Sequence, residues 1–155
     1  MELWDIYDIN KKKTGRVIDR CSNEKLRKGE YHLVVEAIII NSKGEILICK
    51  RAVTKKEYPL KWECIEGSCI KGETSLEAIL REIKEEIGIN LKKAEAIFYK
   101  TIKDDKAKDF KDIWLFRKND KNLKIQQNLA KVWYNININL KKEMNDYDNE
   151  TKRII

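Results

Sequence analysis

The segment from Thr74 to Gly88 constrains the fold of this chain more than any other, because it carries the signals of an amphipathic α-helix. Thr74 and Glu77 have the spacing of a capping box, in which each side chain bonds the backbone amide of the other residue. Gly88 lies where a left-handed C-terminal cap is expected. Apolar residues recur at helical spacing and predict one buried face, made of Leu76, Ile79, Leu80, Ile83 and Ile87.

The same helix carries three glutamates on one edge. On a helical wheel of about 100° per residue, Glu82 and Glu86 point within about 40° of each other, and Glu85 lies about 60° to the other side. Like charges one turn apart destabilise a helix, and the helix dipole disfavours negative charge near its C-terminal end. A cation should compensate them, and a hard divalent ion such as Mg²⁺ suits carboxylate oxygens. From the helix alone, a merely solvated glutamate edge stays open as the alternative.

Strand signals lie on both sides of this helix. An alternating segment and a turn predict an N-terminal hairpin over residues 3–20, followed by a polar connector over residues 21–30. One helix among strands in mixed order predicts an α/β or α+β sandwich. The other expected strands are at residues 32–40 and 45–49, around Trp62, and near residues 94–100, 113–116 and 132–138.

Length and composition bound the class of protein. At 155 residues we expect a single domain, with its core over residues 31–140 and a polar tail over 141–155. The longest apolar run, residues 37–40, is too short to span a bilayer, and an N-terminus with Glu2 and Asp5 does not resemble a secretory leader. Four cysteines without a C-x-x-C pair are typical of reduced thiols, so we expect a cytoplasmic protein.

A net charge of +7 attracts anions such as nucleotides, phosphates and nucleic acid, but we favour the simpler interpretation that lysine is a common surface residue in this sequence. No recognised nucleic-acid motif accompanies this charge, so we expect no specific nucleic-acid partner. We also expect no membrane association. The sequence leaves a homodimer open.

The residues around the helix form a longer pattern. From Gly67 the chain runs through five residues to Glu73, through seven more to Arg81, and then reads Arg-Glu-Ile-Lys-Glu-Glu-Ile-Gly-Ile. This resembles the complete Nudix box at all nine defined positions. The resemblance implies an α/β/α sandwich with a mixed central sheet, here with an added N-terminal β-hairpin. It also implies a hydrolase that uses Mg²⁺, or Mn²⁺, and attack by a metal-activated water to cleave a diphosphate linkage in a nucleoside diphosphate linked to another moiety.

The resemblance assigns metal ligands by position. Glu85 and Glu86 are the expected magnesium ligands, and Glu82 is either a further ligand or the general base. In this family the backbone carbonyl corresponding to that of Gly67 is often a ligand too. A glycine is expected there because the backbone must approach the metal closely.

Three further residues have roles around these ligands. The resemblance implies that Arg81 orients Glu82 through a bidentate pair and belongs to the catalytic set. It implies that Glu73 braces the loop against the helix. Arg51, at a strand end, is a candidate phosphate contact for the substrate, with an ordinary surface arginine as the alternative.

One stretch departs from the family pattern. Many members carry a further acidic ligand before a Trp-containing strand, but residues 126–133 contain no carboxylate. The missing group motivates a second hypothesis, a catalytically weak module that binds or senses a nucleotide. The candidate substitutes are Glu66, Asp104, Asp105, Asp109 and Asp112.

The N-terminal pattern over residues 4–8 is similar to proteins related to isopentenyl-diphosphate isomerase. His32, the single histidine, matches one metal ligand of that isomerase by position. The isomerase also needs a cysteine before the box, where this chain has residues 66–68, Glu-Gly-Ser, and where Cys64 and Cys69 do not align. An isomerase-like enzyme is therefore a disfavoured third hypothesis. We expect His32 to begin a strand and to be hydrogen-bonded to a neighbour.

Overall fold

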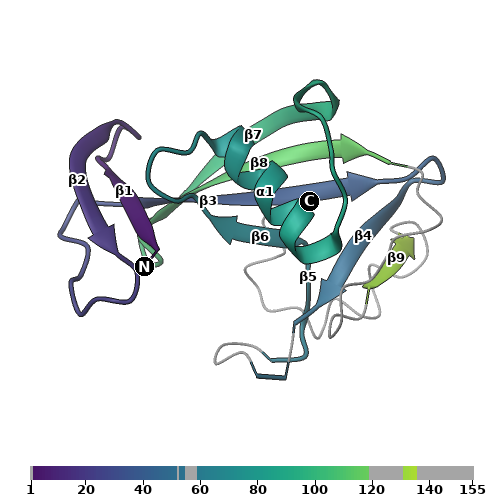
Figure 1. Cartoon of the computed structure of the whole chain (residues 1–155), viewed down its shortest axis with the longest axis horizontal. Coiled ribbons are helices and arrows are strands. Elements are labelled where there is room, and N and C mark those ends of the chain that lie inside the picture. Colours follow the sequence, from purple (N-terminus) through teal and green to yellow (C-terminus); the bar gives the residue numbers. More distant parts are fainter. Residues whose placement is uncertain (1, 52, 55–58, 119–130, 136–155) are drawn as a thin grey trace.

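The computed structural model describes residues 2–51, 53–54 and 59–118, and the backbone of residues 131–135. These residues form an N-terminal hairpin, a seven-stranded mixed sheet and one α-helix (Figure 1). In chain order the elements are β1 (Leu3–Tyr7), β2 (Lys13–Asp19), β3 (His32–Ile40), β4 (Glu45–Lys50), β5 (Trp62–Glu63), β6 (Ile65–Ser68), α1 (Ser75–Ile87), the 3₁₀ turn η1 (Lys93–Glu95), β7 (Ala96–Asp104), β8 (Asp109–Arg117) and β9 (Lys131–Asn135).

The central strand of the sheet is β3. It runs parallel to β8, in register from the pair His32–Asp109 to the pair Ile40–Arg117. It is antiparallel to β6 along its first half and to β4 at its end. Beyond these neighbours, β7 pairs with β8, and β5 and β9 both pair with β4. The mixed central sheet predicted from the sequence is therefore confirmed.

The sequence did not predict β6, because its four residues, Ile-Glu-Gly-Ser, contain no alternating pattern. It also predicted β8 too short. Lys111 and Asp112 interrupt the apolar run of β8, yet both residues pair in register with β3. Of the strand predicted at residues 132–138, residues 136–138 lie outside the described part of the chain, as does the predicted tail over 141–155.

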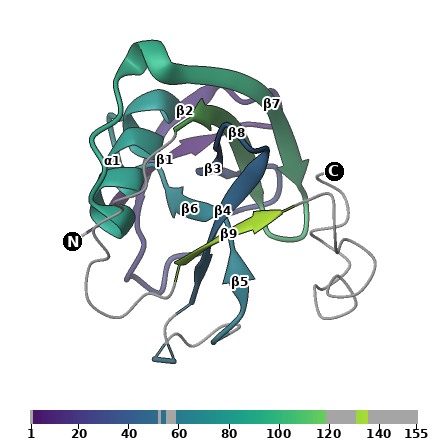
Figure 2. The same ribbon diagram turned by 90° about the vertical axis from the view of Figure 1, so that its right-hand side faces the viewer.

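Helix α1 has both predicted caps. The Glu77 amide donates to the Thr74 hydroxyl at 3.2 Å, the Thr74 amide donates to the Glu77 carboxylate at 3.1 Å, and Gly88 has a φ of 72°. The helix packs along one face of the sheet (Figure 2). Leu76 and Leu80 of the predicted face are only partly buried. The buried residues of the helix are Ala78, Ile79, Ile83 and Ile87, and they face Leu33, Val35, Ala37 and Ile39 of β3.

The predicted sandwich has helices on both faces of its sheet. Among residues 2–118 and 131–135, as far as they are described, α1 is the only α-helix, so the second helical layer is not part of what the structure describes. No helix in this part of the chain is long and apolar enough to cross a membrane.

The predicted N-terminal hairpin is confirmed as β1 and β2, and its contacts with the rest of the molecule include a strand bridge and an ion pair. Tyr7 and Tyr31 form an isolated antiparallel bridge, with N–O distances of 2.8 and 2.9 Å. At the hairpin turn, the Lys11 ammonium forms an ion pair with Asp112 on β8, whose side chain is only 4% exposed. Asp112 also accepts a hydrogen bond from the Thr101 hydroxyl at 2.5 Å. A buried carboxylate is thus neutralised by a lysine about a hundred residues away.

Candidate active site

Strand β6 places Gly67 directly beneath the carboxyl group of Glu82. A Cβ atom added to Gly67 would overlap the Glu82 side chain. Gly67 does not have a positive φ, so backbone freedom does not explain the glycine. The space is needed because Glu82, only 13% exposed in its side chain, packs against the strand. The sequence prediction gave a different reason for this glycine, namely that the backbone must approach a metal.

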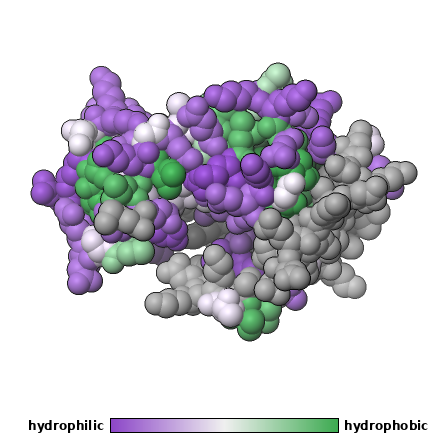
Figure 3. Space-filling model, viewed as in Figure 1, coloured by the Kyte–Doolittle hydropathy of each residue, from purple (hydrophilic) through white to green (hydrophobic). Residues whose placement is uncertain are grey.

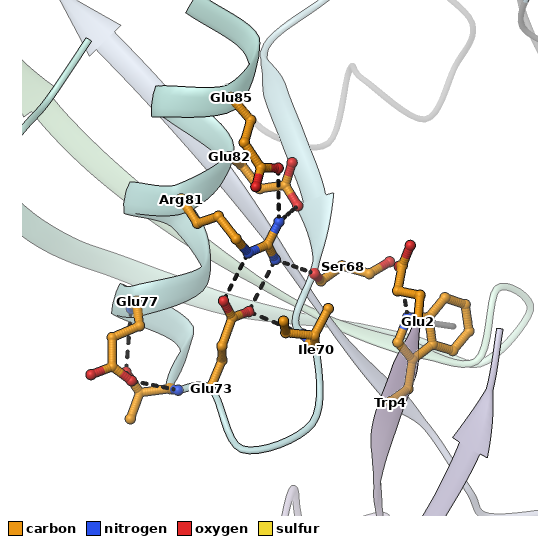
Figure 4. Close-up of polar contacts among 10 residues, drawn as sticks. Glu2, Trp4, Ser68, Ile70, Glu73, Glu77, Arg81, Glu82 and Glu85 are labelled. Carbon is orange, nitrogen blue, oxygen red and sulfur yellow. Dashed lines mark hydrogen bonds and ion pairs between the residues drawn. The ribbon is translucent and has the colours of Figure 1, made fainter. Parts of the chain in front are cut away.

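Arg81 connects the helix, the preceding loop and the glutamates (Figure 4). Its guanidinium forms a bidentate pair with Glu73, at 2.7 and 3.0 Å. Another of its nitrogens donates to Glu82 at 2.7 Å and to Glu85 at 3.2 Å. The nitrogen that donates to Glu73 at 3.0 Å also donates to the Ser68 carbonyl, at 3.0 Å. Arg81 therefore orients Glu82 as predicted, but through a single nitrogen, since the bidentate partner is Glu73 instead.

Glu73 closes the loop that leads into the helix. Besides its pair with Arg81, its carboxylate accepts a hydrogen bond from the Ile70 amide at 3.1 Å. The Glu73 amide in turn donates to the Ile70 carbonyl at 3.1 Å. The side chain thus binds the loop on one side and the helix on the other, which is the bracing arrangement expected from the sequence.

The electrostatic environment of Glu82 favours proton uptake. Burial is the largest cause that raises the pKa of Glu82, and the charges of Glu85 and Glu2 raise it further. Arg81 opposes this shift through its hydrogen bond and its charge. The hydrogen bond with Glu73 is the largest cause that raises the pKa of Arg81, so the guanidinium stays charged.

The three helix glutamates share an edge but are not gathered around a common point. Glu85 is 58% exposed and contacts Arg81, and Glu86 is half-buried one turn after Glu82. Among the residues whose side chains are described, no three His, Cys, Asp or Glu side chains form a group that could hold a metal ion. Hydrophilic side chains dominate the surface over α1 in the view of Figure 3. The site as described is therefore a carboxylate edge organised by an arginine.

This arrangement of Gly67, Glu73, Arg81 and the helix glutamates matches a known family. Residues 30–153 match the family model of the NUDIX domain. The chain belongs to the Nudix family. An uncharacterised Nudix hydrolase of Listeria monocytogenes is 46% identical over 90 residues, which are 57% of this chain and 52% of that protein. This chain spans about half the length of the curated relatives it matches.

The Nudix relatives include the isomerase group noted from the N-terminal pattern. An isopentenyl-diphosphate Delta-isomerase of Escherichia coli is 32% identical over 68 residues, covering 43% of this chain and 37% of that protein. A solved structure from Deinococcus radiodurans has a TM-score of 0.68 at 20% identity and covers 85% of this chain and 83% of its own. This likeness shows that the two chains share a fold.

Arg51, the predicted phosphate contact of this Nudix chain, lies at the junction of β4 and β5. Its guanidinium donates to the Glu63 carboxylate at 2.6 Å. Its backbone amide donates to the Lys61 carbonyl at 2.8 Å. The structure therefore gives Arg51 a partner on β5, and its contact with a substrate remains a prediction.

The aspartates considered as substitutes for the late Nudix carboxylate lie around β7 and β8. Asp112 is buried in its ion pair with the hairpin, and Asp109 begins β8. Asp105 accepts a hydrogen bond from the Tyr31 hydroxyl at 2.6 Å, and Asp104 caps the turn between the two strands. The stretch over residues 126–130 lies outside the described residues, and of residues 131–133 only the backbone is described.

Glu66 belongs to a charged group on the sheet face opposite α1 that the sequence reasoning missed. Lys111 on β8 forms ion pairs with Glu66 and, at 3.4 Å, with the buried Glu36. Burial raises the pKa of Glu36, which the Lys111 charge opposes. One signal was available, because Glu36 is an acid within an otherwise apolar stretch of β3.

His32 begins β3 as predicted, and its backbone amide donates to the Lys108 carbonyl at 3.1 Å. Its ring Nδ1 atom is buried and has no hydrogen-bond partner among the residues that the structure describes. The ring stacks on Trp4 of the hairpin, with centroids 4.2 Å apart and planes 7° apart. Burial lowers the pKa of His32 to about 4, and the charge of Arg20 lowers it further. The histidine therefore serves packing between the hairpin and the sheet.

We expect His32→Phe to reduce the loss of stability in acid. The unfolded chain, with a histidine pKa near 6.5, takes up the proton before the folded chain does. The free energy of unfolding should therefore fall from about pH 6.5 to about pH 4, by up to about 1.4 kcal/mol for each pH unit. Phenylalanine keeps a ring against Trp4 and does not titrate. Urea unfolding of both proteins between pH 4 and 7 measures this difference, and equal slopes would contradict the assignment.

Proposed function

We propose that this chain is a magnesium-dependent hydrolase that cleaves the diphosphate linkage of a nucleoside diphosphate joined to another moiety. The observation that carries the proposal is the connected set of Gly67, Glu73, Arg81 and Glu82. In this set a loop and a helix hold a half-buried carboxylate edge in one orientation. Such positioning suits a reaction that depends on placing phosphate charge and a water molecule.

The donor chemistry of this edge fits Mg²⁺. Glu82, Glu85 and Glu86, with the carbonyl of Gly67, offer only oxygen atoms, which Mg²⁺ prefers. Glu73, Glu82 and Glu85 share one arginine, so this part of the site has an excess of negative charge that a cation would offset. Mg²⁺ would supply neutralisation of the diphosphate charge and activation of the attacking water.

The protein residues have separate tasks in this proposal. Arg81 holds Glu82 by a 2.7 Å hydrogen bond, so that its carboxylate cannot rotate freely. Burial raises the pKa of Glu82, which makes this group a better proton acceptor than an exposed glutamate. Glu82 is either a metal ligand or the general base, and the proposal keeps both roles.

A panel of nucleotides tests this function directly. The protein is incubated with nucleoside diphosphates linked to sugars, nucleosides or further phosphates, in Mg²⁺ and then in Mn²⁺. Release of a nucleoside monophosphate that depends on the metal is the expected result. If the folded protein cleaves no member of a broad panel with either metal, the hydrolase proposal is wrong.

Gly67→Ala should lower the catalytic rate much more than the stability of the fold. The added methyl group displaces the carboxyl group of Glu82, and we expect kcat to fall by about 10–100-fold because misplaced catalytic groups are costly. The melting temperature should fall only modestly, since the atoms nearest to the added methyl group all belong to one side chain. Gly44→Ala is the matched control. Gly44 has a φ of 78° and open space around it, so that variant should lose about 1 kcal/mol of stability and keep its kcat. Equal kcat in both variants would contradict this account.

A nucleotide-binding or sensing module is the second candidate function. It is favoured by Arg81, which already engages Glu82 and Glu85, and by the lack of a carboxylate at residues 126–133. Equilibrium binding of a nucleotide without product, over long incubation with Mg²⁺, would support this candidate over hydrolysis.

The isomerase hypothesis has weaker support. Cys64 and Cys69, which flank the loop before the helix, are free thiols. Burial raises the pKa of Cys69 to about 12 and also raises the pKa of Cys64. Neither thiol is therefore prepared for acid–base chemistry near neutral pH. Incubation with isopentenyl diphosphate and Mg²⁺ should give no isomer.

A further inference from the structure

Strand β1 of the N-terminal hairpin is hydrogen-bonded to the loop that leads into α1. The Lys71 amide donates to the Leu3 carbonyl at 2.6 Å. The next amide, that of Gly72, donates to the Asp5 carboxylate at 2.9 Å. Figure 4 shows Glu2 and Trp4 of the hairpin beside the loop at Ser68 and Ile70. Two consecutive amides of the loop are therefore fixed by an element from the start of the chain.

The Asp5 carboxylate is prepared to accept this bond. Lys13, on the partner strand of the hairpin, donates to the same oxygen at 2.6 Å. Partial burial opposes ionisation of Asp5, but the hydrogen bonds from Lys13 and from the Gly72 amide outweigh it and lower the pKa of Asp5. Asp5 is thus a charged acceptor, and charge-assisted hydrogen bonds are stronger than neutral ones.

The Gly72 amide lies at the start of a short series of contacts that ends at the carboxylate edge. Gly72 has a φ of 88°, so the chain turns there and delivers Glu73 toward the helix. Glu73 binds Arg81 at 2.7 and 3.0 Å. Arg81 in turn binds Glu82 at 2.7 Å. A displacement at Gly72 would therefore change where Arg81 holds Glu82.

The hairpin lies entirely outside the family model, which matches residues 30–153. We propose that the hairpin is a positioning element of the active site, in which Asp5 holds the Gly72 amide and so sets the orientation of Glu73 and Arg81. This inference rests on the proposed magnesium-dependent hydrolysis. In this proposal Asp5 does not contact the carboxylate edge and acts only through the loop before α1.

Four variants of the full chain test the proposal. Asp5→Ala removes the acceptor, whereas Asp5→Asn keeps an oxygen for the Gly72 amide. Lys13→Met removes only the charge partner of Asp5. Arg16→Gln removes the ion pairs that join Arg16 of the hairpin to Glu24 and Glu30 of the connector, and these pairs do not reach the loop before α1. It controls for general loosening of the hairpin.

Two measurements are made on each variant. The first is the Mg²⁺ concentration that gives half of the full rise in melting temperature. Where the nucleotide panel has given a substrate, the Mg²⁺ concentration that gives half of the full activity is measured too. The second is hydrogen exchange of the Gly72 amide without metal. In Asp5→Ala we expect the half-saturating Mg²⁺ concentration to rise about 10-fold, as for outer-sphere partners of metal ligands, and the Gly72 amide to exchange faster. The KM for the substrate should change less. Asp5→Asn should restore both values, and Lys13→Met and Arg16→Gln should resemble the wild type.

The outcomes separate the two proposals. If the wild type shows neither activity nor a magnesium response, the proposed function fails and this inference falls with it. If the wild type responds to Mg²⁺ and Asp5→Ala responds equally, the inference alone is overturned. It is also overturned if Arg16→Gln weakens the magnesium response as much as Asp5→Ala does, or if Asp5→Asn gives no rescue. Should Asp5→Ala fail to fold, Asp5→Asn and Lys13→Met decide. Both variants are expected to retain the magnesium response. Loss of that response in Asp5→Asn overturns the proposal.

Discussion

Glu86→Gln is expected to lower kcat by about 100-fold or more while the fold stays intact. The substitution keeps the size of a half-buried side chain and removes one negative charge from the carboxylate edge. A metal ion at such a site contributes several kcal/mol of transition-state stabilisation, and each 1.36 kcal/mol corresponds to about a tenfold change in rate. Relief of the repulsion with Glu82 one turn earlier returns only about 0.2–0.5 kcal/mol of stability. The variant should therefore be as stable as the wild type, or slightly more stable.

Two measurements distinguish a metal ligand from a solvated glutamate. With Glu86→Gln, the rise in melting temperature caused by Mg²⁺ should shrink along with activity. Lys84→Gln is the matched control, because Lys84 is an exposed residue of the same helix. It should keep both the activity and the magnesium response. An unchanged magnesium response in both Glu85→Gln and Glu86→Gln would refute the assignment of these carboxylates.

Lys11→Met is expected to destabilise the protein by about 3 kcal/mol, which corresponds to a decrease in melting temperature of roughly 6–12 °C. Lys11 is 29% exposed and neutralises Asp112, which is 4% exposed. Without the ammonium, the carboxylate stays buried and keeps a hydrogen bond from the Thr101 hydroxyl. Removal of one partner of a buried ion pair costs far more than loss of a surface pair, because the other charge stays desolvated.

Lys12→Met is the matched control for this prediction. Lys12 is the exposed neighbour in the same turn, so its replacement should change the melting temperature little. The double variant Lys11→Met with Asp112→Asn should be less destabilised than the sum of the two single variants, since it leaves no unpaired charge. Thermal unfolding of the wild type, the two single variants and the double variant measures this coupling, and Lys12→Met is measured beside them. Additive effects, or equal effects of Lys11→Met and Lys12→Met, would show that the pair does not hold the hairpin turn to β8.

The accuracy of the sequence predictions depended on how far apart the interacting residues lie in the chain. The capping box at Thr74, the left-handed cap at Gly88 and the common edge of Glu82, Glu85 and Glu86 involve residues within about one turn of each other. Such contacts follow from helical geometry, which is the same in every helix. The hairpin and the strand at residues 32–40 were equally accessible, because an alternating pattern and a run of β-branched residues are local signals too.

Other features escaped the sequence because the signal is not local. The four residues of β6 carry no strand pattern, and they form a strand only because β3 offers a partner. Arg81 could pair with several acids, and the choice of Glu73 as its bidentate partner depends on the loop geometry. Lys111 looked like an interruption of β8, although the fold buries it between Glu36 and Glu66.

The sequence by itself determined most of the strands, the capped helix and the carboxylate edge that places the chain in the Nudix family. Only the tertiary structure decided how that edge is held. The reason for a glycine at position 67 is the Glu82 carboxyl group packed above it. The loop before the helix is hydrogen-bonded to Asp5, which lies near the start of the chain. Residues separated by 15 and by 67 positions meet in these contacts. Their pairing depends on sheet register and helix packing, which no short-range pattern encodes.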